Sequence, residues 1–277
     1  MWLRHGASLA LGAGSTSRGR PTIVRMPAAG SEPPIADGTT LRVEVLSVVF
    51  QIRVPQIRFS PNTAPDSGCD SDTDDPSLCV LLTRSVDGLW TLPGGGVGAE
   101  ETLSASARRL VADSLDVRDI AHLEQLSVFS DPHRVPVFRT IASTYMGLVP
   151  SDAAATPPDA AGWFAVDELP PLAFDHTEIV DAARHRLAAK LSYTNIAFAL
   201  APARFPMSAL SEIYCAALGY PVDTTNLLRI LSRRAVVVST GTVGKTGRSG
   251  GRPPALYAFA EKELRVTDEF ATLRPPM

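Results

Sequence analysis

Residues 90–117 read WTLPGGGVGAEETLSASARRLVADSLDV, and this stretch decides the fold of the larger part of the chain. The glycines at 94–96 indicate a loop. Apolar residues then recur at the spacing of one helix face, so the loop leads into a helix that packs through an apolar stripe. The stripe consists of Leu103, Ala107, Leu110, Val111 and Leu115.

Polar residues follow the loop at fixed distances. Glu101 lies after five intervening residues from Gly95, and Arg109 lies after seven more. This register resembles the box of the Nudix hydrolase family, and the preceding Leu92-Pro-Gly94-Gly resembles the family's loop. The resemblance implies that Glu101 and Arg109 tie the loop to the helix, and that both glycines shape a nucleotide pocket.

The metal-binding carboxylates of that box are mostly absent. The family has Glu at the positions of Leu110 and Ser114, and an acid remains only as Asp113. Residues spaced i, i+3 and i+4 share one face of a helix, where three carboxylates would hold magnesium. Magnesium demands nearly octahedral oxygen coordination, so Asp113 alone is only a weak candidate ligand. We therefore predict no catalytic residue, no required cofactor and no efficient hydrolysis.

Composition is that of an ordinary soluble protein. The 277 residues suffice for one or two domains, with 45% apolar and 20% charged residues and a net charge of −3. No apolar run of about 18 residues is present to span a membrane. The three cysteines have neither zinc-ligand spacing nor an even count, which favours reduced thiols and a cytoplasmic location. Residues 1–40 are predicted to be a disordered extension, with Met26 as an alternative start.

Strand-like and helical segments alternate up to residue 191. Val- and Ile-rich runs at 41–53, 78–83, 123–128 and 139–148 predict strands, and 177–191 predicts a second helix. Strands around the loop-helix stretch fit an α/β/α sandwich. The predicted ligand-sensing domain covers residues 41–188.

A different pattern begins after this helix. Ser208 is placed to cap a helix that Gly219 ends, and Asp223 is placed to cap a second one. Two β-type runs at 235–240 and 255–260 then bracket a basic, glycine-rich loop. Two helices followed by a hairpin predict an α+β winged helix-turn-helix domain over residues 189–265, with a tail at 266–277.

Basic residues gather in this second part, where Lys and Arg outnumber Asp and Glu by eight to two between Lys190 and Ala260. The exposed face of the second helix suits a major groove, and the hairpin tip suits the phosphate backbone or minor groove. The alternative is a solvated basic face on a dimerisation module. The predicted DNA-binding residues are Thr224, Thr225, Asn226, Arg229, Arg233, Lys245, Arg248 and Arg252.

The order of these parts resembles the Nudix-related transcriptional regulators of NAD metabolism, the NrtR type. Three further segments carry the resemblance. They are FSDPHRVP at 129–136, DELPPLAFDH at 167–176 and KLSYTNIAFALAP at 190–202. His176, at a helix start beside Asp175, is interpreted as a packing or capping residue.

The resemblance implies a homodimeric repressor of NAD biosynthesis or salvage genes. It would bind ADP-ribose or a related NAD-derived nucleotide as effector, and a palindromic double-stranded operator. Arg84, Arg134 and Arg139 are candidate phosphate clamps. Two alternatives stay open: a weakly active Nudix pyrophosphohydrolase with a C-terminal interaction domain, in which Asp113, Glu100 and Glu101 hold a weaker metal site, and a nucleotide sensor that binds a protein partner.

Overall fold

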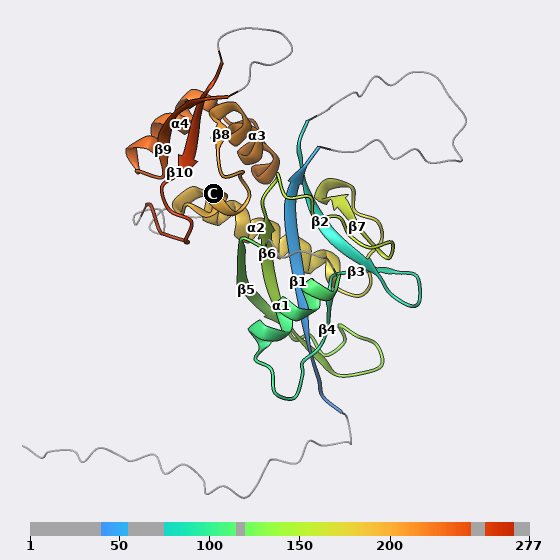
Figure 1. Cartoon of the computed structure of the whole chain (residues 1–277). Helices are drawn as coiled ribbons and strands as arrows, with labels where there is room; N and C mark the ends of the chain where they lie inside the picture. Colours follow the sequence, from blue (N-terminus) through green and yellow to red (C-terminus); the bar gives the residue numbers. More distant parts are fainter. Residues whose placement is uncertain (1–39, 55–74, 115–119, 245–252, 269–277) are drawn as a thin grey trace, which may run out of the picture. The chain divides into compact units, whose positions relative to one another are not determined.

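The structure of the chain is a computed structural model that describes residues 40–54, 75–114, 120–244 and 253–268 (Figure 1). The predicted extension at 1–40 falls almost wholly outside these ranges. Outside these ranges lie also Lys245, Arg248 and Arg252 at the predicted hairpin tip, and most of the predicted tail. Among the helices of the described ranges, none is long and apolar enough to cross a membrane.

A mixed sheet forms the first part of the chain. Its central strand β1 (Arg42–Arg53) runs parallel to β6 (Thr140–Val149) and antiparallel to β2 (Ser77–Arg84). The order β3-β2-β1-β6-β5 is completed by β4 on β1 and β7 on β2. The remaining strands are β3 (Trp90–Thr91), β4 (Gly94–Gly96), β5 (His122–Phe129) and β7 (Ala161–Ala165).

Helices pack on both faces of this sheet. Side chains alternate between faces along a strand, and both faces of β1 are buried. Val45 packs with Ala107 of α1 (Leu103–Ser114), whereas Leu46 packs in the cluster that contains Ile179 of α2 (His176–Tyr193). The predicted α/β/α sandwich is thus confirmed. Leu103 is 37% exposed, so the apolar stripe of α1 begins effectively at Ala107.

The C-terminal part is a winged helix, as predicted. Helices α3 (Met207–Leu218) and α4 (Thr224–Arg233) lie in sequence between the first and the second strand of a three-stranded sheet in the order β8-β10-β9. Its strands are β8 (Phe205–Pro206), β9 (Val237–Val243) and β10 (Ala255–Phe259). Two short 3-10 helices precede this part: η1 (Val166–Glu168) lies before α2, and η2 (Ile196–Ala199) lies after it.

The predicted helix ends are correct in two of three cases. Gly219 ends α3 with a left-handed φ of 76°, and the Asp223 side chain accepts a hydrogen bond from the Asn226 amide at 2.7 Å. The prediction that Ser208 caps α3 is wrong, because Ser208 lies inside the helix and Pro206 occupies the capping position. Pro206 is still paired with Leu256, so the chain passes from β8 directly into α3.

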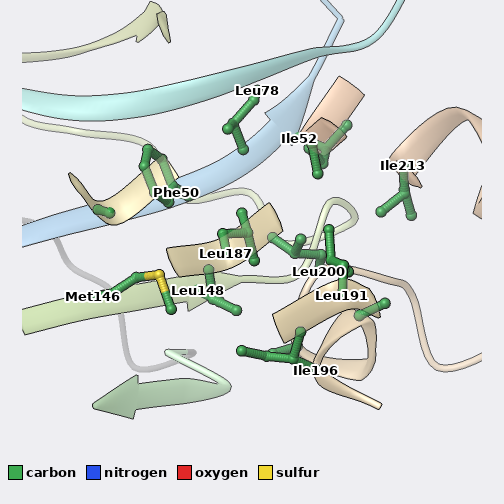
Figure 2. Close-up of a cluster of buried hydrophobic side chains, with 14 of the residues drawn as sticks. Phe50, Ile52, Leu78, Met146, Leu148, Leu187, Leu191, Ile196, Leu200 and Ile213 are labelled. Carbon is green, nitrogen blue, oxygen red and sulfur yellow. The ribbon is translucent and has the colours of Figure 1, made fainter. Parts of the chain in front are cut away.

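A single apolar cluster joins the sheet to the helices that follow it (Figure 2). Phe50 and Leu148 contribute from the sheet, Leu187 from α2, Leu200 from the segment after η2, and Ile213 from α3. The expected boundary between residues 188 and 189 falls inside α2. Helix α2 is therefore shared between the sheet and the segment that leads into the winged helix.

Candidate functional site

The junction between the glycine loop and α1 is tied by Glu101. Its carboxylate accepts hydrogen bonds from Nε and Nη2 of Arg109 at 2.7 and 2.8 Å, and from Ser106 Oγ at 2.7 Å. A longer bond of 3.3 Å comes from the Gly98 amide. The bonds from Arg109, then Ser106, lower the pKa of Glu101 to about 2. The expected structural tie is present.

The face of α1 that would hold a metal does not gather carboxylates. Asp113 is 66% exposed at its side chain and lies 3.6 Å from Arg109 Nη1. Leu110 packs with Val45, Ala107 and Tyr145. In the described part of the chain, no group of three or more His, Cys, Asp or Glu side chains could hold a metal ion.

The glycine loop lies against the central strand. Gly94, Gly95 and Gly96 form β4, which pairs antiparallel with β1. A Cβ on Gly94 would stand 2.5 Å from the Val45 carbonyl oxygen, and a Cβ on Gly95 would stand 3.0 Å from Leu110 Cδ2. The loop therefore has room for glycine alone at position 94.

Arg134 lies inside the protein between two carboxylates. Its Nε and Nη2 donate to Asp175 at 2.8 Å each, and Nη1 donates to Glu44 at 2.6 Å. Only 1% of its side chain is exposed. Burial lowers the pKa of Arg134, but the bonds to Asp175 and Glu44 outweigh burial and raise the pKa overall. Hence the structure does not present this candidate clamp to an external phosphate.

The other two candidate clamps have different surroundings. Arg139 donates from Nη1 to the carbonyl oxygens of Ser130 at 2.9 Å and Asp131 at 3.2 Å, which closes the loop between β5 and β6. Arg84 is exposed and stacks over Trp90, with its guanidinium carbon 4.9 Å from the ring centroid. Arg84 is the clamp candidate most open to a ligand.

The sheet separates the candidate effector residues into two groups. In the β1–β4 register, Glu44 is opposite Gly96 and Val45 is opposite Gly95. Glu44 has the parity of Leu46, which faces α2, so the ion pairs of Arg134 lie on that face. Glu101 and Arg109 lie at α1 on the other face. Within the described part of the chain, β1 and its neighbour β4 both adjoin the two groups.

His176 is hydrogen-bonded to the start of the glycine loop. The Leu92 amide donates to its Nδ1 at 3.0 Å, and the side chain is buried with 3% exposure. Burial lowers the pKa of His176 to about 4, so the imidazole is neutral at pH 7. The packing interpretation of His176 is confirmed.

The sequence did not predict Glu44 and Asp175 as partners of Arg134, because no local pattern marks contacts between segments so far apart.

Helix α4 exposes the residues expected to bind DNA. Leu227 and Leu231 are buried, whereas Thr225, Asn226, Arg229 and Arg233 are exposed, and Thr224 is partly exposed. Arg229 Nη2 donates to Asn226 Oδ1 at 2.7 Å. The exposed face therefore carries a paired amide and guanidinium, and these two groups are the ones most used to read base edges in a major groove.

Two pockets lie away from all these residues. The larger, of about 670 Å³, follows β2 and β7 and is lined by Arg53, Cys79, Trp163 and Phe164, among others. The smaller, of about 400 Å³, is lined by Arg53, Glu212 and mostly apolar neighbours. Neither contains a predicted effector residue, so neither extends the candidate site.

The fold and the site define a Nudix domain followed by a DNA-binding winged helix. Residues 69–183 match the NUDIX domain family, and residues 197–259 match the NrtR DNA-binding winged helix domain. The ADPR responsive transcriptional repressor NtrR of Acinetobacter baylyi is 31% identical over 201 residues, which cover 68% of this chain and 78% of that protein. The chain belongs to the NrtR family of Nudix-related transcriptional regulators.

Solved structures show the same fold. NrtR of Shewanella oneidensis superposes with a TM-score of 0.62 at 24% identity, and its complex with a 27mer DNA superposes with 0.60 at 23% identity. Both alignments cover 78% of this chain and 93% of the other. A MutT/nudix family protein of Enterococcus faecalis gives a TM-score of 0.54 at 18% identity, over 79% of this chain and 86% of the other.

Proposed function

We propose that the chain is a transcriptional repressor of NAD biosynthesis or salvage genes that responds to ADP-ribose or a related NAD-derived nucleotide. The observation that carries the proposal is the state of the Nudix box. The bonds of Glu101 to Arg109 keep the loop and helix together, while Leu110 and the exposed Asp113 leave the metal face incomplete. A nucleotide is bound in this site and is not efficiently hydrolysed.

The effector site is built from both sides of β4. Gly94 lets the loop lie close against β1, Gly95 lets it lie close to Leu110 of α1, and Glu101 with Arg109 holds the loop in shape beside the nucleotide. Arg84 supplies positive charge for a phosphate, and Arg139 shapes the neighbouring loop. These assignments agree with a relative that is named for its response to ADPR.

DNA binding belongs to the winged helix. The exposed face of α4 enters a major groove with Asn226 and Arg229, and the basic residues between β9 and β10 contact the backbone. Two protomers of a homodimer place two such helices about 34 Å apart on a palindromic operator. Such a protein works beside the chromosome, in the cytoplasm.

The test uses the full chain and promoter DNA of its own gene and of NAD-synthesis genes. Fluorescence anisotropy measures the Kd for DNA with and without ADP-ribose or NAD, and the same mixtures are assayed for ADP-ribose cleavage with magnesium. We expect sequence-specific binding that a nucleotide changes several-fold, without turnover. Turnover without specific DNA binding would replace the proposal by the hydrolase alternative, and binding to a protein partner alone would replace it by the sensor alternative.

A further inference from the structure

We infer that α2 couples the nucleotide site to the recognition helix α4. We further infer that residues 261–268, the C-terminal strap, hold the C-terminal end of α2, which is the end closer to α4. The inference rests on the proposed function, because coupling presupposes two binding sites. It assigns a role to a segment that the sequence alone marks only as the end of a domain and the start of a tail.

The N-terminal end of α2 is held by the segments that form the nucleotide site. Asp175, which directly precedes the helix, accepts both bonds from Arg134. His176, the first helical residue, accepts a bond from the Leu92 amide of the glycine loop at 3.0 Å. The Ala173 amide donates to Trp90 O at 2.9 Å. A nucleotide that shifts either loop therefore pulls directly on this end of α2.

The C-terminal strap holds the opposite end of the same helix. Tyr193 O, at the last residue of α2, accepts bonds from the amides of Thr267 at 2.7 Å and Asp268 at 3.2 Å. Asn195, only 2% exposed, bonds through its side chain to Glu263 O at 2.9 Å and to the Arg265 amide at 2.7 Å. A buried side chain bonded on both sides leaves little freedom between α2 and the strap.

Arg234 connects this end of α2 to the recognition helix. It is the C-terminal capping residue of α4, and its Nη1 donates to Ser192 O of α2 at 3.0 Å. Its Nη2 donates to Asp268 of the strap at 2.6 Å. The Asp268 side chain is only 13% exposed, so this ion pair is better shielded from water than a surface pair. One guanidinium thus joins α4, α2 and the strap.

Helix α2 between these two ends is long and firmly packed. Its 18 residues span about 27 Å at about 1.5 Å per residue. Ile179, Val180, Ala183 and Leu187 are fully buried against the sheet cluster. A packed helix moves as a unit, so a small rotation at the nucleotide end changes the angle at which α4 meets DNA. Such couplings typically change affinity by about 5- to 150-fold.

The experiment measures the coupling factor, which is the ratio of the DNA Kd values with and without saturating ADP-ribose. Asp268→Asn removes the ion pair at the strap with almost no change in shape, and Arg234→Gln removes the guanidinium with its bonds to both Asp268 and Ser192. We expect both variants to keep the wild-type ADP-ribose Kd in the absence of DNA, and to lower the coupling factor at least about threefold. A merely structural role would change thermal stability or DNA affinity and leave the ratio intact.

The matched control is Glu261→Gln. Glu261 lies in the same strap and pairs with Arg265 at 3.4 Å, but both side chains are exposed and neither contacts α2 or α4 through that pair. We expect it to keep the wild-type coupling factor. Full coupling in both Asp268→Asn and Arg234→Gln would overturn the inference, as would an equal loss in Glu261→Gln.

A second pair of variants tests the nucleotide end. Arg134→Gln releases Asp175, whereas Arg184→Gln breaks an exposed pair of α2 with Asp167 and serves as control. The double variant Arg134→Gln/Asp268→Asn is expected to have the same coupling factor as whichever single variant has the lower one. The reason is that both contacts act in series, so breaking either one already interrupts the path. Additive losses would contradict a single path. If the wild-type DNA Kd does not respond to any nucleotide, the proposed function itself fails.

Discussion

One buried positive charge near the candidate nucleotide site is balanced by carboxylates inside the protein. Arg134 is enclosed by Glu44 and Asp175, with only 1% of its side chain exposed. Removal of one partner of such a group leaves an uncompensated buried charge, which costs several kcal/mol, whereas replacing all partners together costs much less. Arg134 therefore acts as a positioning residue that joins β1, the β5–β6 loop and the start of α2.

His176 gives the protein a specific dependence on pH. Its folded-state pKa of about 4 lies below the ordinary value of 6.5, so the unfolded chain binds the proton first. The contribution of the neutral, buried His176 to the free energy of unfolding is fully present above pH 6.5 and is lost as pH falls toward 4. We expect this residue to lower the free energy of unfolding by about 2 kcal/mol between pH 7 and pH 5. Urea unfolding at both pH values measures the loss.

The comparison variant is His176→Asn, which does not titrate and retains an acceptor for the Leu92 amide. Its stability should fall less than that of the wild type over the same interval. His185→Asn removes an exposed histidine of the same helix and serves as the control. Equal pH dependence in all three proteins would show that His176 is not buried in its neutral form.

Strand β4 lies next to both groups of candidate effector residues. Its glycines pair with β1, and their two faces meet Leu46 on one side and Leu110 on the other. The space available differs sharply along the strand. At Gly94 a Cβ meets backbone at 2.5 Å, whereas at Gly96 nothing lies within 4 Å. These two positions provide a test with an internal control.

Gly94→Ala is expected to destabilise the protein by about 1 to 3 kcal/mol, because overpacking forces the backbone of β1 and β4 apart. It should also weaken ADP-ribose binding, since the loop leaves its position. Gly96→Ala should change stability by less than about 1 kcal/mol, the cost of an ordinary backbone substitution. Urea unfolding and calorimetric titration with ADP-ribose measure both effects. Similar stabilities of the two variants would refute the close approach of β4 to β1.

At the scale of the whole molecule, charge is divided unequally along the chain. The net charge is −3, although basic residues dominate from Lys190 to Ala260. Binding to a polyanion through a basic surface releases counterions, so affinity falls steeply with salt. A partner protein bound through α4 would show a much weaker dependence. Salt dependence therefore separates the repressor from the alternative sensor.

We expect the slope of log K for operator DNA against log salt to become shallower by about 0.9 for each phosphate contact removed. Arg233→Ala should show this loss on every DNA sequence. Arg229→Ala should additionally reduce discrimination between operator and unrelated DNA, because Arg229 is paired with Asn226 on the exposed face. Arg108→Ala, an exposed residue of α1, serves as the control and should retain the wild-type slope. Identical slopes in all variants would remove α4 from the DNA interface.

Local sequence patterns predicted the order and type of the main elements. The box from Gly95 to Arg109, the alternating strands, Gly219 and Asp223 are local signals, because periodicity, capping and turn preference act within a few residues. The same local register was enough to predict that Glu101 joins Arg109. Family membership followed from the arrangement of these local motifs.

Contacts between residues far apart in the chain became visible only in the folded structure. Glu44 and Arg134 are separated by 90 positions, Arg134 and Asp175 by 41, and Asn195 and Arg265 by 70. Sequence pattern does not encode these pairings, because they depend on the parallel placement of β1 beside β6 and on the return of the strap to α2. For this reason Arg134 resembled a free phosphate clamp in the sequence, and proved to be an internal link in the folded chain.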